Sequence, residues 1–61
     1  MTWSATDKLR CVERELSYRY RVFARKVEKG EMTQHQASRE ISIMEQIASE
    51  YREQAEKEQL L

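Results

Sequence analysis

Apolar residues recur at helical spacing in both halves of the chain. In the first half, intervals of three or four residues separate Leu9, Val12, Leu16, Tyr20, Phe23 and Val27. In the second half, the same intervals separate Ala37, Ile41, Met44, Ala48, Tyr51 and Ala55. Because an α-helix turns by ~100° per residue, each set forms a stripe along one side of a helix. The pattern predicts two helices that pack stripe against stripe.

The segment SYRYRVFARK, residues 17–26, also alternates polar and apolar residues, as a β-strand does. Residues before and after it keep the helical spacing over several turns of ~3.6 residues. We therefore interpret the segment as helical, with Tyr20 and Phe23 directed into the hairpin and Tyr18 and Val22 directed away from it.

One glycine and two capping sequences mark the ends of these helices. Gly30 follows a lysine and suits the position just after a helix, where the backbone is often left-handed. Thr33 and Gln36 have the spacing of a capping box at the start of the second helix. Ser4 and Asp7 have the same spacing at the start of the first helix.

These signals predict an all-α fold, an antiparallel hairpin of helices at about 5–29 and 33–58, because a link this short makes the helices neighbours. Residues 1–61 then form a single domain. We expect Trp3 to pack back on the first helical turn; the alternative is that it anchors a binding partner.

The apolar surface is wider than a hairpin can cover. Ile43 and Ile47 extend the apolar side of the second helix to roughly 160°. We expect these two residues to lie at an oligomer interface, with two chains forming a four-helix bundle. Cys11, Tyr18 and Val22 lie roughly opposite the stripe of the first helix. They are either scattered surface residues or part of a second contact surface.

Size and composition favour an oligomer or a bound partner over a self-sufficient monomer. The chain has 61 residues and one cysteine, so it cannot form an internal disulfide. Cys11 and His35 match no metal-binding motif, and we expect no metal and no cofactor. No apolar run approaches the ~20 residues of a membrane span, and the N-terminus does not resemble a signal peptide. We expect a cytoplasmic protein that does not associate with membranes.

Charge is divided between the two helices. Residues 7–29 contain eight basic and four acidic residues, a net charge of +4. Residues 30–61 contain three basic and seven acidic residues, a net charge of −4. Opposite charge favours antiparallel packing by a modest energy, since exposed ion pairs contribute ~0–1 kcal/mol each.

Four arginines of the first helix fall within roughly 60° of one another. This arginine stripe consists of Arg10, Arg14, Arg21 and Arg25. Three interpretations of the stripe are open. It is a solvated face whose arginines pair with glutamates of the second helix or of a second subunit. Otherwise it binds an acidic protein, with Tyr18 at the centre of the contact, or the phosphates of a nucleic acid. The neutral net charge and the acidic second helix argue against nucleic acid.

No catalytic constellation is visible in the sequence. The serines have His35 as their only candidate base, and no glycine-rich phosphate loop is present. A carboxylate-bridged metal pair would need Glu-x-x-His motifs, which are missing. We therefore expect a protein that is not an enzyme.

One pattern of residues covers most of the chain. It runs through Val12–Glu15, Arg19, Arg21, Val22, Phe23, Val27, Gly30, Met32, Thr33, Ala37, Glu40, Ile41, Met44, Ile47 and Tyr51. In this pattern the chain resembles a type of small protein encoded by phages and prophages. The resemblance implies a phage origin and a helical hairpin, and small phage proteins often bind a host or defence protein. The architecture is also similar to Rop, a plasmid RNA-binding protein whose helical hairpins dimerise, although no sequence motif links the two.

The sequence thus predicts a homodimeric binding protein that acts in the host cell as an adaptor or inhibitor of a host protein, including an anti-defence role. The contact residues are expected to be Arg10, Arg14, Tyr18, Arg21 and Arg25, with Cys11 and Val22 beneath them. The alternative is a regulator that binds RNA or DNA through the same arginines. A further alternative has both sides of the first helix buried in a larger assembly.

Overall fold

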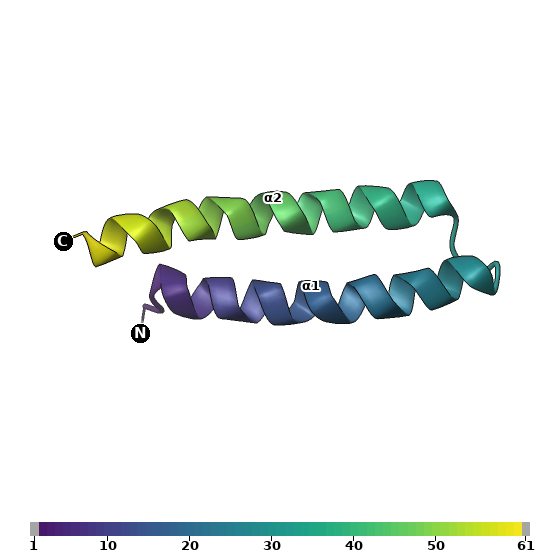
Figure 1. The fold of residues 1–61 in the computed structure, drawn as a ribbon, viewed down its shortest axis with the longest axis horizontal. Helices are drawn as coiled ribbons and strands as arrows, with labels where there is room; N and C mark the ends of the chain where they lie inside the picture. The colour runs from purple at the N-terminus through teal and green to yellow at the C-terminus, as the bar shows by residue number, and fades with distance from the viewer. Residues whose placement is uncertain (1, 61) are drawn as a thin grey trace.

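A computed structural model, which describes residues 2–60, consists of two antiparallel helices: α1 (Ala5–Glu28) and α2 (Gln34–Gln59). The predicted all-α hairpin is confirmed, and each helix ends within one residue of the predicted bounds. Figure 1 shows the turn at one end of the hairpin and both termini at the other, open end. The molecule is a rod with dimensions of 47 × 18 × 16 Å.

The turn stops α1 through its own backbone. Gly30 adopts a φ of +75°, in the left-handed region where a side chain would be strained. The Glu31 amide then donates to the Lys26 carbonyl at 2.8 Å, and the Gly30 amide donates to the Val27 carbonyl at 3.1 Å. These are the two hydrogen bonds of a Schellman motif, which satisfies the free carbonyls at a helix end. The glycine in the sequence therefore ends α1 as predicted.

The predicted capping box at the start of α2 is present in full. The Thr33 hydroxyl accepts from the Gln36 amide at 3.0 Å, and the Gln36 side chain accepts from the Thr33 amide at 3.0 Å. At the start of α1, Ser4 caps the helix by accepting from the Asp7 amide at 3.1 Å. The Asp7 carboxylate does not complete a box there, because it accepts from the Ser4 hydroxyl instead.

A side chain from the far end of the sequence completes the start of α1. The Glu58 carboxylate accepts from the Ala5 amide with both oxygens, at 3.1 and 3.2 Å. The first amides of a helix have no partner inside the helix and carry partial positive charge, so a carboxylate is favourable there. Glu58 thereby joins α2 to α1 at the open end of the hairpin.

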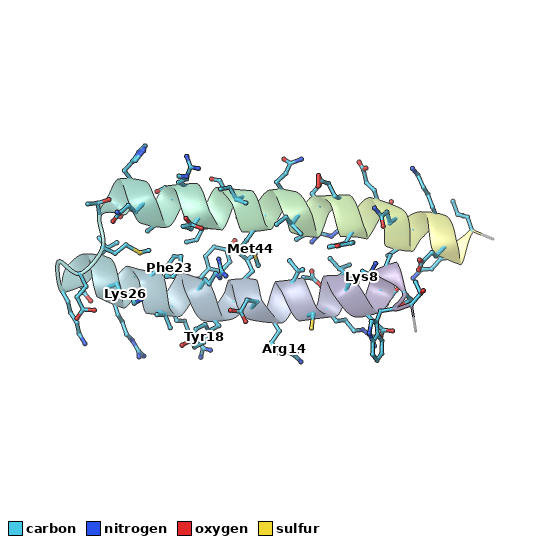
Figure 2. All side chains as sticks on the ribbon, turned by 180° about the vertical axis from the view of Figure 1, so that it is seen from behind. Lys8, Arg14, Tyr18, Phe23, Lys26 and Met44 are labelled. Carbon is cyan, nitrogen blue, oxygen red and sulfur yellow. The ribbon has the colours of Figure 1, made fainter. Side chains whose placement is uncertain are left out.

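The seam between the helices is narrow and built from small residues. Its buried residues are Ala5, Leu16, Ala37, Ala48 and Ala55. Val12, Phe23 and Met44 are half-buried, and Figure 2 shows Phe23 and Met44 between the two ribbons. Alanine lets helix backbones approach closely but buries little apolar area. One chain therefore buries few large side chains.

Tyr20 lies at the edge of the seam, although the sequence predicts it inside. It stays 46% exposed, and its hydroxyl donates to the Glu45 carboxylate at 2.6 Å. The reason is its angle on α1, about 40° from the middle of the stripe at ~100° per residue, which lets the phenol reach the polar side of α2. The hydrogen bond to Glu45, with partial desolvation, raises the pKa of Tyr20 above its ordinary value.

Neither helix within residues 2–60 is long and apolar enough to cross a membrane.

Candidate interaction surfaces

Two cross-helix contacts define the register of the hairpin. Tyr20 bonds to Glu45, and Arg52 bonds to Glu13 at 3.2 Å. Glu13 lies seven residues before Tyr20 on α1, and Arg52 lies seven residues after Glu45 on α2. The two contacts therefore agree on one antiparallel register. Both contacts lie along the same edge of the seam, by the ~100° spacing on each helix. We call this side of the hairpin the polar face.

The opposite broad side, the apolar face, is assembled differently. Near the open end, the Lys8 ammonium lies 5.7 Å from the centre of the Tyr51 ring. Farther along, helical spacing places Val22, Ile43 and Ile47 on this side. Ile43 is 44% exposed, whereas Val22 and Ile47 are half-buried. One chain therefore covers this row of branched apolar side chains only in part.

The arginine stripe lies on the side of α1 that faces away from α2. All four arginines are exposed, and within residues 2–60 none of them lies within 4.0 Å of a carboxylate. Figure 2 shows Arg14 and Tyr18 pointing away from α2. The glutamates of α2 in the same chain thus do not pair with the stripe, which removes one form of the solvated-face interpretation.

Tyr18 and Cys11 border the stripe as the sequence predicts. Tyr18 is 53% exposed, and the Arg14 guanidinium donates to the exposed Cys11 sulfur at 3.4 Å. This contact holds Arg14 against α1 near the thiol. The place of Val22 beneath the contact residues stays a prediction; at ~100° per residue its side chain lies about 90° from the centre of the stripe, on the side of α1 that carries Lys8. It therefore belongs to the apolar face.

Trp3 and the first turns of α1 form a cleft that the sequence does not reveal. The cleft has a volume of about 320 Å³ and is lined by Trp3, Asp7, Lys8 and Cys11. Trp3 is expected to pack back on the first helical turn; it lines this cleft together with residues of the first turns and stays 62% exposed. Cys11 is shared between the cleft and the contact with Arg14. The cleft and the arginine stripe are consequently parts of one continuous surface.

Among residues 2–60, no three His, Cys, Asp or Glu side chains gather closely enough to hold a metal ion. His35 lies exposed in the first turn of α2.

No family model matches the chain, and searches of curated proteins and of solved structures returned no match. The resemblance to small phage proteins, and the similarity of architecture to Rop, stay predictions.

Proposed function

We propose that this protein is a non-enzymatic binding protein that docks an acidic segment of another protein on the outer surface of α1. The observation that carries the proposal is the stripe formed by Arg10, Arg14, Arg21 and Arg25, which has no carboxylate partner within residues 2–60. Arginine forms paired hydrogen bonds with carboxylates, and an exposed tyrosine beside it supplies contact area. Tyr18 has that position.

The cleft at Trp3 adds an apolar end to this surface. Its volume of about 320 Å³ is at the small end of ligand pockets and suits one apolar side chain. The indole of Trp3 offers apolar contact to such a side chain. We therefore propose a partner segment that carries several carboxylates and one large apolar residue at one end. The resemblance to phage proteins favours a host protein as the source, with the chain acting as adaptor or inhibitor.

The test compares two variants with the same change in charge. Arg14→Glu with Arg21→Glu reverses the middle of the stripe, whereas Arg39→Glu with Lys57→Glu makes the same change on α2. A tagged chain is used to purify bound proteins from host cells, and the affinity of each bound protein is then measured. We expect the stripe variant to lose at least about 100-fold in affinity, because hot-spot residues contribute about 2 kcal/mol or more each.

Helicity and the number of chains in the assembly should be unchanged in both variants, since these side chains are exposed. A bound protein with equal affinity for the stripe variant and the control would refute the proposal. A gel shift with DNA or RNA that is lost steeply with salt would favour the nucleic-acid alternative, because phosphate contacts release counterions.

We also propose that the chain self-associates. Its accessible surface is 5076 Å² for a mass of 7.4 kDa. A compact monomer of that mass exposes about 4200 Å² by the usual scaling of surface with mass. The excess is close to the ~800 Å² that each partner buries in a standard interface. The exposed Ile43 and its half-buried neighbour Ile47 support the apolar face as the surface that a second copy covers.

A further inference from the structure

We infer that two copies pack apolar face on apolar face around a twofold axis parallel to the helices. In this arrangement α1 of each copy lies over α2 of the other, and both turns lie at the same end of the dimer. The inference rests on the self-association proposed above and adds its geometry. Three observations lead to it: the register of the hairpin, the position of the apolar residues along it, and the charge along each helix.

The register places complementary residues at the same height. Starting from the Tyr20–Glu45 hydrogen bond, two residues forward along α1 and two back along α2 bring Val22 level with Ile43. A twofold axis parallel to the helices keeps every residue at its own height in both copies. Val22 of one copy therefore meets Ile43 of the other, and both pairs of branched side chains are covered at once.

The apolar residues are not centred on the hairpin. Val22 lies 17 residues from the start of α1 and only six from its end. A twofold axis perpendicular to the helices would have to pass through this row to bury it against itself. The open end of each rod would then extend beyond the turn of the other copy and contact nothing there. The parallel axis covers the same row and keeps the full length of the rods in contact, which buries more surface.

The charged residues on the apolar face also favour the parallel axis. On the apolar face, α1 carries Lys8, Arg19 and Lys26 together with Glu15, and α2 carries Glu40, Glu50 and Glu58, by the ~100° spacing. Continued in the same register, Lys26 is nearly level with Glu40 and Lys8 with Glu58.

Placing α1 over α2 of the second copy therefore sets opposite charges against each other. Placing α1 over α1 sets like charges together. One unfavourable approach, Glu15 to Glu50, is offset because Arg19 lies 3.8 Å from Glu15 in the same chain.

Distances between spin labels distinguish the two axes. The native thiol is removed with Cys11→Ser, and a single cysteine is introduced by Gln59→Cys at the open end or by Glu31→Cys in the turn. For the parallel axis, pulsed electron paramagnetic resonance should give separations under about 30 Å at both sites, because neighbouring helix axes are ~8–10 Å apart. For a perpendicular axis, the Gln59 labels should be about 40 Å apart or more, from ~1.5 Å per residue along α2.

Sedimentation of the same labelled samples separates failure of the geometry from failure of self-association. A dimer mass with short distances at both sites supports the inference. A dimer mass with a long distance at residue 59 overturns the parallel axis and leaves self-association standing. A monomer mass overturns both proposals, and a tetramer mass overturns the two-chain arrangement.

Discussion

The two broad faces of the hairpin join α1 to α2 in different ways. On the polar face, Tyr20 reaches Glu45 and Arg52 reaches Glu13, so long polar side chains span the seam within one chain. On the apolar face, the middle of the seam is bordered by Val22, Ile43 and Ile47, and Ile43 is 44% exposed. The polar face is therefore complete in a single chain. The apolar face leaves its side chains partly exposed until something else covers them.

Because the two faces differ, self-association and partner binding would use different surfaces of the hairpin. Within residues 2–60, the arginines on the outward side of α1 have no carboxylate partner and the apolar face carries the exposed Ile43, whereas the polar face carries the side-chain bonds between the helices. A second copy on the apolar face leaves the outward side of each α1 exposed. Self-association and partner binding can consequently occur together, and a dimer would present two arginine stripes.

The largest expected effect comes from a charge placed on the apolar face. Ile43→Glu should weaken self-association by at least about 100-fold, roughly 3 kcal/mol, because an unpaired carboxylate would be buried at the interface. Since a hairpin this small has little core of its own, loss of helicity at low concentration should accompany dissociation. Sedimentation equilibrium and circular dichroism over a range of concentrations measure both.

Ser42→Glu is the matched control for that change. Ser42 is the preceding residue, is also exposed in the single chain and lies toward the polar side of α2. Its substitution should change stability by no more than about 0.5 kcal/mol, as is usual at exposed positions. If Ile43→Glu were as harmless as Ser42→Glu, or if the wild type sedimented as a monomer, the assignment of the apolar face would fail.

A smaller effect is expected at the open end, where Glu58 joins the helices. Glu58→Gln keeps a hydrogen-bond acceptor but removes the charge beside the start of α1. We expect a loss of about 0.5–1 kcal/mol, the usual contribution of a carboxylate at a helix N-terminus. Urea unfolding at fixed protein concentration measures it, and faster hydrogen exchange at the Ala5 amide locates it.

Glu53→Gln removes the same charge from α2 at a residue that has no ion-pair partner within residues 2–60. This variant should keep both the stability and the exchange rate of the wild type. Equal losses in the two variants would mean that total charge, rather than the bond to Ala5, is responsible.

Features that depend on neighbouring residues were accessible from the sequence. Thr33 and Gln36 are three residues apart, and Gly30 acts through its own backbone, so the turn and both helix boundaries followed from local chemistry. The outward direction of the arginine stripe also followed, because it depends only on the angle between residues of one helix.

Features that depend on how the helices meet were not accessible. Glu58 and Ala5 are 53 residues apart, and nothing local identifies them as partners. Tyr20 was predicted inside the seam because spacing gives an angle but not how far a phenol reaches across to Glu45. The cleft at Trp3 was missed because residues 2–4 precede the helix and have no periodicity to place them. What the sequence lacked in each case was the register between the two helices or the path of the chain before α1.

The smallest expected effect is a pH dependence confined to the polar face. The hydrogen bond to Glu45 raises the pKa of Tyr20, so the neutral phenol is favoured in the folded chain. The folded pKa is raised above the unfolded value of about 10, so this stabilisation is fully present below pH ~10 and is lost as pH rises through the folded pKa.

In a chain carrying Tyr18→Phe and Tyr51→Phe, the ultraviolet absorbance of tyrosinate reports Tyr20 alone. Its midpoint should lie above pH ~10 and fall toward that value in Glu45→Gln, which removes the carboxylate charge from its hydrogen-bond partner. Ile43→Gln, a change on the other broad face, should leave the midpoint of the folded chain unaltered. A midpoint that moved with Ile43 but not with Glu45 would show that the two faces are not independent.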